Sequence, residues 1–129
     1  MPHLTFEYTD NLRADGDIPG LLKKANAVLI AQGGVFPVGG IRTRAICYSE
    51  YCIADGEADY AFVHASLKIG FGRSEDEKNK ACEALFATMQ AHFAAIAASR
   101  YLALSLEIAE FSEAGTWKQN NIHARFRQP

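Results

Sequence analysis

The sequence predicts an α+β fold in which two β-α-β units form a four-stranded sheet with two helices on one face. Two observations predict it: alternating apolar segments flank each of two helical segments, and each helical segment has its own start signal. The two pseudo-repeats span about residues 2–48 and 60–110, and a C-terminal arm follows over 112–129. A chain of 129 residues has the length of one ordinary domain, so we expect a single domain over 1–129.

The first half contains a strand, a helix and a second strand. Residues 2–8 alternate apolar and polar side chains, as a strand with one buried face does. Asp17 is placed to cap a helix, which we expect Gly33 and Gly34 to end. The next strand is predicted over about 41–48. The helix between them has one apolar stripe, formed by Ile18, Leu21, Leu22, Ala25, Val28 and Leu29.

The second half repeats this plan. Small apolar residues alternate over 60–69, which predicts the third strand. Ser74 and Glu77 have the spacing of a capping box, so a long helix is predicted over about 75–98. Alternating leucines then predict the last strand over about 102–110.

The face of the predicted sheet that points away from the helices is neither fully polar nor fully apolar. A mixed face of this kind usually contacts another copy of the chain, so we expect an oligomer. Its residues are Tyr60, Phe62, His64, Ser66 and Lys68 on the third strand, and Ala103, Ser105, Glu107 and Ala109 on the last.

Composition argues against several classes of partner. The net charge of −2 disfavours nucleic acid and anionic membranes as the main partner, and no apolar run is long enough to span a bilayer. The start of the chain lacks the features of a signal peptide. The three cysteines are odd in number and widely spaced, as suits reduced thiols. We therefore expect a cytoplasmic protein with neither a nucleic-acid nor a membrane partner.

Pro2 is the residue that points most directly to chemistry. Small residues after an initiator methionine normally permit its removal, which would leave Pro2 with a free secondary amine. An α-amino group ordinarily titrates near 8, and burial or nearby positive charge lowers its pKa towards the pH where a general base works best. A chance proline at a permissive site is the alternative.

Three arginines are candidates for binding anions. Arg42 and Arg44 are two residues apart on a strand that we expect to be an inner strand, so they share one sheet face. Arg73 follows two glycines at the corner before the second helix, where backbone can approach a ligand. The alternative for Arg42 and Arg44 is pairing with glutamates of the chain or exposure at an edge.

Other reactive residue types form no recognisable site. The four histidines lack metal-ligand spacing, and Cys47 and Cys52 have no second cysteine pair, so we expect no metal. The polar segment with Asn120, Asn121 and His123 has two equal interpretations: it caps a neighbouring subunit, or it is a solvated tail.

The chain resembles a known family at several places. They are Pro2 and residues 40–44, 59–64, 68–74 and 118–124, in addition to the two β-α-β units. Together these features are similar to the 5-carboxymethyl-2-hydroxymuconate Δ-isomerase family of the tautomerase superfamily. The resemblance spans nearly the whole chain.

The resemblance implies a tautomerase-like fold, a homotrimer with sheets packed about a central axis, and no cofactor. It also implies an isomerase of 4-hydroxyphenylacetate (homoprotocatechuate) catabolism that acts on a small anionic dienol, 5-carboxymethyl-2-hydroxymuconate. Pro2 matches the catalytic proline of the family, and Arg42 and Arg73 match arginines near its active site. Two alternatives stay open: a tautomerase of another 2-hydroxymuconate-like acid, and a non-catalytic trimeric binding or signalling protein of the same fold.

Overall fold

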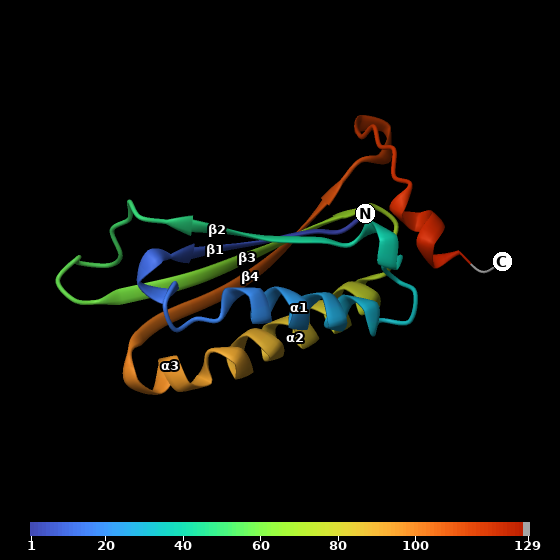
Figure 1. Ribbon diagram of the computed structural model, residues 1–129. Coiled ribbons are helices and arrows are strands. Elements are labelled where there is room, and N and C mark those ends of the chain that lie inside the picture. The colour runs from blue at the N-terminus through green and yellow to red at the C-terminus, as the bar shows by residue number, and fades with distance from the viewer. Residues whose placement is uncertain (128–129) are drawn as a thin grey trace.

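The computed structural model describes residues 1–127 and contains the predicted pattern of strand, helix and strand twice (Figure 1). In chain order the elements are β1 (His3–Thr9), α1 (Ile18–Ile30), β2 (Arg42–Tyr48), β3 (Tyr60–Gly70), α2 (Glu75–His92), α3 (Ala94–Ser99) and β4 (Tyr101–Phe111). Short 3-10 turns accompany them. One, Val38–Gly40, precedes β2, and two, Glu113–Gly115 and Ile122–Phe126, follow β4.

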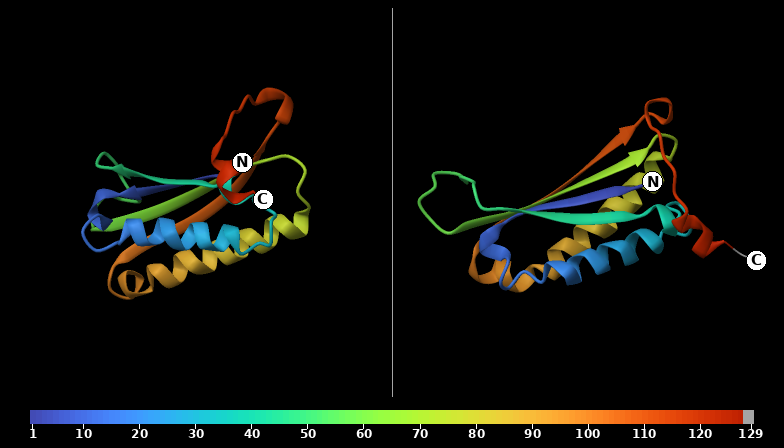
Figure 2. Two further views of the ribbon diagram at one scale, coloured as in Figure 1. Left: turned by 45° about the vertical axis from the view of Figure 1, so that its right-hand side comes forward. Right: turned by 45° about the horizontal axis from the view of Figure 1, so that its top comes forward.

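The four strands form one mixed sheet in the order β2-β1-β3-β4. Each β-α-β unit pairs its own strands in parallel, β1 with β2 and β3 with β4, whereas the two units meet through antiparallel β1 and β3. Helices α1 and α2 lie side by side against one face of the sheet (Figure 2). The predicted α+β fold class is confirmed. One detail is wrong: β2 lies at the edge of this sheet, so Arg42 and Arg44 are not on an inner strand.

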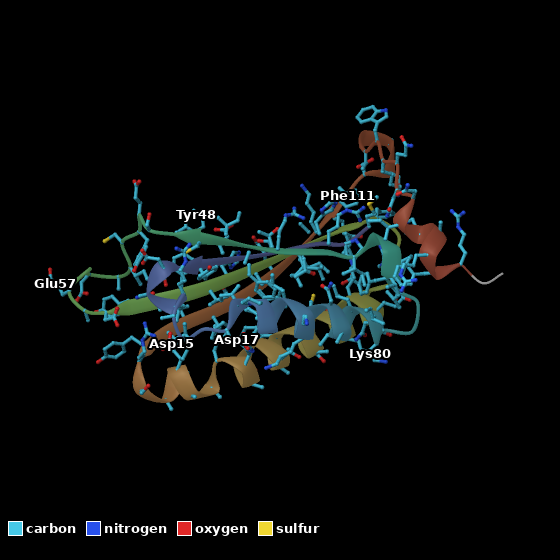
Figure 3. The ribbon with its side chains drawn as sticks, in the orientation of Figure 1. Asp15, Asp17, Tyr48, Glu57, Lys80 and Phe111 are labelled. Carbon is cyan, nitrogen blue, oxygen red and sulfur yellow. The ribbon has the colours of Figure 1, made fainter. Side chains whose placement is uncertain are left out.

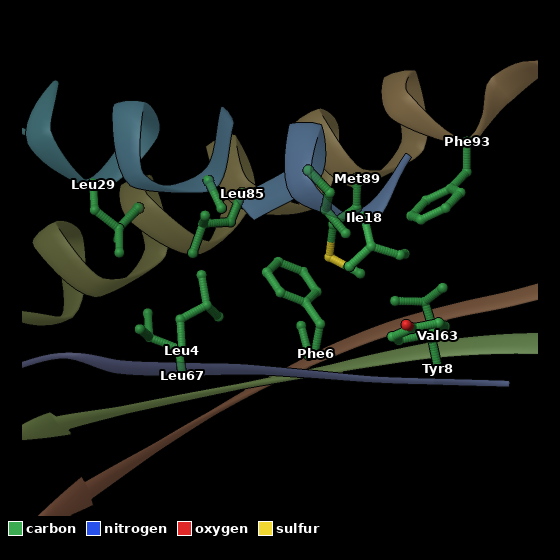
Figure 4. Close-up of a cluster of buried hydrophobic side chains, with 14 of the residues drawn as sticks. Leu4, Phe6, Tyr8, Ile18, Leu29, Val63, Leu67, Leu85, Met89 and Phe93 are labelled. Atoms are coloured by element: carbon green, nitrogen blue, oxygen red, sulfur yellow. The ribbon is translucent and has the colours of Figure 1, made fainter. Parts of the chain in front are cut away.

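The core lies between the sheet and the two helices (Figure 4). Phe6 is fully buried at its centre, between Leu4 and Tyr8 of the same strand face. Fully burying one such side chain stabilises the fold by about 1.5–3 kcal/mol. The apolar and polar side chains of β1 alternate because every second side chain fills this layer.

Both predicted helix starts are confirmed by hydrogen bonds. The Asp17 carboxylate accepts from the Gly20 backbone N–H at 3.2 Å, and a Cβ at Gly20 would overlap that carboxylate. Ser74 Oγ accepts from the Glu77 N–H at 3.1 Å, while Glu77 Oε1 accepts from the Ser74 N–H at 2.9 Å. Ser74, which directly follows Arg73, thus fixes the start of α2 at Glu75 and with it the position of that arginine.

Both predicted helix ends are wrong. Helix α1 ends at Ile30, and Gly33 and Gly34 lie beyond it in a turn with φ of 71° and 91°. The second helix does not continue to residue 98 but breaks at Phe93, whose φ and ψ are −99° and 10°. Burial of the Phe93 ring and a hydrogen bond from His92 Nε2 to the Gly16 carbonyl at 2.8 Å hold the chain in this bend.

Within residues 1–127, the helices are too short or too polar for any of them to traverse a lipid bilayer.

Candidate active site

The candidate site lies at the end of the sheet where β1 and β2 begin and where β3 and β4 end. The N-terminus meets the C-terminal segment there (Figure 1). Phe111 marks this end, whereas Tyr48, the last residue of β2, lies at the opposite end (Figure 3). Because β1 pairs antiparallel with β3, while β2 and β4 run parallel to their partners, the N-terminus and the segment after β4 meet at this end of the sheet.

A first cavity of about 410 Å³ opens at this edge. Its walls come from the N-terminus, the turn before β2, the corner before α2 and the segment after β4. The lining residues are Met1, Pro37, Gly40, Arg73, Glu113, Lys118, Asn120 and His123.

A second cavity of about 300 Å³ adjoins the first and shares Met1 and Lys118 with it. It lies over the start of β1 and β2. The lining residues are Met1, His3, Arg42, Phe111, Thr116, Trp117, Lys118 and Gln119. The two cavities together bring three cationic side chains, those of Arg73, Arg42 and Lys118, around the N-terminus.

Arg73 is held rigidly in the wall of the first cavity. Its Nε donates to the Val35 carbonyl at 3.0 Å and its Nη1 to the Gly70 carbonyl at 3.2 Å. The guanidinium also lies over the Phe36 ring, 4.8 Å from the ring centroid. Because a guanidinium has five N–H donors, these contacts orient Arg73 and still leave donors for a carboxylate.

Arg42 lines the second cavity, but Arg44 lines neither cavity. Arg42 Nη1 donates to the Gly40 carbonyl at 2.9 Å. Arg44 Nη1 lies 3.1 Å from His3 Nδ1. Burial, followed by the charges of Arg44 and Arg42, lowers the pKa of His3, so a neutral His3 accepts the Arg44 hydrogen bond. The two arginines are two residues apart on β2, as residues on one sheet face are, but Arg42 lines a cavity of the site and Arg44 does not.

Pro2 is buried, and its carbonyl accepts from the Arg42 N–H at 3.1 Å. With Met1 in place, the Pro2 nitrogen is part of an amide and has no basic lone pair. The terminal amino group, on Met1, has a pKa below its usual range. Burial is the largest cause, followed by the charges of Arg73 and Lys118, while Glu113 acts in the opposite direction. An amine at this position thus lies in an electropositive, partly desolvated setting.

The sequence did not single out Lys118, Glu113 or His123 as site residues. The polar tail was expected either to cap a neighbouring subunit or to be solvated. Within this chain most of its residues are exposed, whereas Asn120 and His123 are half-buried. Asn120 Nδ2 donates to the Gly39 carbonyl at 2.7 Å, and His123 lies against the same turn. The signal in the sequence was the pair of glycines, Gly39 and Gly40, which allows another segment to approach closely. Both are buried where the tail packs.

Over residues 1–127, no three His, Cys, Asp or Glu side chains come together in a way that could hold a metal ion. The walls of the two cavities contain three cationic side chains, the Glu113 carboxylate and the amino terminus of the chain.

Comparison with known proteins decides the family. The model of the 5-carboxymethyl-2-hydroxymuconate isomerase family matches residues 2–126. The chain belongs to this family. It is 48% identical over 127 residues to 5-carboxymethyl-2-hydroxymuconate Delta-isomerase of Escherichia coli, covering 98% of this chain and 100% of that protein. It is thus an isomerase of this family, and the resemblance seen in the sequence is confirmed.

Solved structures agree with this assignment. A 5-carboxymethyl-2-hydroxymuconate isomerase from Deinococcus radiodurans R1 has a TM-score of 0.94 at 59% identity, covering 98% of this chain and 95% of that one. A fused 4-OT, named as a symmetric trimer, has a TM-score of 0.70 at 15% identity, covering 91% and 93% of the two chains. At that identity the second likeness shows only the fold, which is the fold expected of a tautomerase.

Proposed function

We propose that this protein converts 5-carboxymethyl-2-hydroxymuconate to its conjugated isomer, 5-carboxy-2-oxohept-3-enedioate, in 4-hydroxyphenylacetate catabolism, with Pro2 as general base and acid. The observation that carries this proposal is the placement of the N-terminus between two cavities with Arg73, Lys118 and Arg42 in their walls. A substrate with three carboxylates needs such a cationic setting. The proposal also requires that Met1 is removed.

In the proposed reaction the Pro2 nitrogen accepts the proton of the 2-hydroxyl group. The oxygen electrons then form the 2-oxo group, and the double bond between C2 and C3 moves to C3 and C4. The π electron pair of the double bond between C4 and C5 moves to C5, and a single bond remains between them. The protonated proline returns one proton to C5, so the reaction is balanced without a co-reactant. One amine serves both steps if its pKa is close to the working pH.

The arginines support this chemistry in two ways. A guanidinium fixed by backbone carbonyls, as those of Arg73 and Arg42 are, can bind a carboxylate without first being ordered. Positive charge also stabilises the dienolate that forms when the hydroxyl loses its proton. The same charges favour the neutral form of the amine, which is the form that accepts the proton.

We further propose that the protein is a homotrimer of the cytoplasm. The sheet face away from the helices supports the first part: Phe62 and His64 are half-buried there, and Ala103 is exposed. A face with these side chains is suited to contact with further copies of the chain. The free thiols of Cys47, Cys52 and Cys82 support the second part, because such thiols persist in a reducing compartment.

Substitution of Pro2 by alanine tests the catalytic assignment. Ultraviolet absorbance follows the loss of the dienol as the conjugated ketone forms. We expect Pro2→Ala to lose most of the activity, because it replaces a constrained secondary amine by a primary amine at the same position. A variant that retains full kcat/KM would show that another group is the base.

A further inference from the structure

The segment after β4, residues 112–127, forms part of the candidate site; we call it the C-terminal arm. It runs from the end of β4 back beside the N-terminus (Figure 2). Four of the eight residues that line the first cavity belong to the arm: Glu113, Lys118, Asn120 and His123. Lys118 lines the second cavity as well. The arm is therefore a wall of both cavities.

One glycine limits where the arm can lie. A Cβ at Gly39 would be 2.8 Å from both the Cα and the backbone nitrogen of His123, and a contact this short with backbone is not tolerated. Near its other end the arm approaches Gly70, where a Cβ would be 2.7 Å from Glu113 Oε1, the end of a side chain that can move aside. The arm thus packs against Gly39 at a position where no side chain fits.

Lys118 is held towards the cavities by its neighbour in the arm. Its Nζ lies 3.3 Å from Glu113 Oε2. Both side chains are partly exposed, so this ion pair can open to admit a second anion without the cost of breaking a buried pair. Among the described residues, Lys118 is also the cationic side chain that lines both cavities.

We infer that Lys118 is the residue that recognises the carboxymethyl carboxylate of the substrate, an assignment that rests on the proposed function. The three carboxylates of that substrate differ in flexibility. Two are attached directly to the conjugated chain, and the third is attached through a rotatable methylene. A guanidinium fork suits the first kind, whereas an ammonium on a flexible stem suits the third. Arg73 and Arg42 are fixed by backbone carbonyls, and Lys118 is not.

Glu113 is a positioning residue in this arrangement. Its carboxylate contacts Lys118 and, in the chain that retains Met1, raises the pKa of the terminal amine, against the lowering by burial and the cations; we expect the same direction for the Pro2 amine. Glu113→Gln therefore has two separable effects: a higher KM for the tricarboxylate, because Lys118 is less well oriented, and an acid limb of the pH profile that moves to lower pH. A purely structural role would not move the pH profile.

The test compares two substrates that differ only in the carboxymethyl group: 5-carboxymethyl-2-hydroxymuconate and 2-hydroxymuconate. Both are assayed with wild type and with Lys118→Met, at a pH above the acid limb so that the amine is neutral in each. We expect the variant to lose about tenfold to hundredfold in kcat/KM on the tricarboxylate, mainly through KM, as for the loss of one charged hydrogen bond. Its kcat/KM on 2-hydroxymuconate should stay close to that of wild type. Lys80→Met, an exposed lysine of α2 (Figure 3), is the matched control.

The outcomes separate this inference from the proposed function. An active wild type whose Lys118→Met variant is unimpaired, or is impaired equally on both acids, overturns the assignment of Lys118 alone. A wild type that is inactive on both acids overturns the proposed function and the assignment with it.

Displacing the arm provides a second test that leaves Lys118 in the chain. Gly39→Ala forces His123 away and should raise KM for the tricarboxylate more than for 2-hydroxymuconate. Gly115→Ala is the control, because the nearest atom to a Cβ there is 3.9 Å away. Equal kinetics of the two alanine variants would show that the position of the arm does not matter to substrate recognition.

Discussion

Removal of the Arg73 side chain should affect both binding and the state of the catalytic amine. Hydrogen bonds to the carbonyls of Val35 and Gly70 hold the Arg73 guanidinium in one orientation, in which its remaining N–H groups can bind a carboxylate. Two charged hydrogen bonds to one carboxylate contribute about 3 kcal/mol, which corresponds to roughly a hundredfold in kcat/KM. Arg73→Ala should show a loss of this size, measured from initial rates followed by ultraviolet absorbance.

Arg73→Lys separates the two effects, because it keeps the charge and loses the planar fork. We expect it to lose roughly tenfold in kcat/KM, an intermediate value that reflects one remaining charged contact. Circular dichroism of both variants checks that loss of the bonds to Val35 and Gly70 has not unfolded the corner before α2.

The pH profile of kcat/KM shows whether the Arg73 charge lowers the pKa of the catalytic amine. The amine acts as a base only when it is unprotonated, so activity falls as the pH drops through its pKa. In the chain that retains Met1, Arg73 is the largest charge that lowers the pKa of the terminal amine, after burial, and we expect the same direction for the Pro2 amine that takes its place. Arg73→Ala should therefore move the acid limb of kcat/KM to higher pH, whereas Arg73→Lys should leave it in place. A wild-type rate and an unshifted limb in Arg73→Ala would refute this role of Arg73.

Three further predictions concern other parts of the molecule. Arg42→Ala should lower kcat/KM by about tenfold or more, whereas Arg44→Ala should not, and equal losses would show that the cavity boundaries are wrong. Ser74→Ala should lower the free energy of unfolding by about 1 kcal/mol, seen as a lower Tm at fixed protein concentration, and an unchanged Tm would contradict the role of the capping box. Ala103→Arg should convert a trimer to smaller species in sedimentation while the far-ultraviolet spectrum stays native. A trimer that persists would place the subunit interface elsewhere.

The fold was predictable because its signals are local. The alternation in β1 reports a single buried face, and Asp17 and Ser74 report helix starts through bonds that span only three residues. The break at Phe93 was not predictable in this way. It depends on burial of the Phe93 ring and on a bond between His92 and Gly16, 76 residues away in the chain.

In the candidate site, too, the residues with local signals were predicted and a residue placed by tertiary contacts was not. Pro2, Arg42 and Arg73 were proposed from local patterns and from resemblance to the family, and the structure gathers Arg42 and Arg73 around the N-terminus. Lys118 was missed, because its place depends on how the C-terminal arm packs against Gly39. A lysine in a polar tail has no local feature that separates a cavity wall from a solvated surface. Only the tertiary contact makes it part of the site.

The proposed catalysis requires a free Pro2 nitrogen, which the intact mass of the purified enzyme tests directly. The mass is measured on the same sample whose kcat/KM is determined, and the fraction of molecules that retain methionine is compared with the fraction that is active. We expect the active protein to lack Met1, so that its chain begins at Pro2. A homogeneous, fully active preparation that retains Met1 would contradict the central claim.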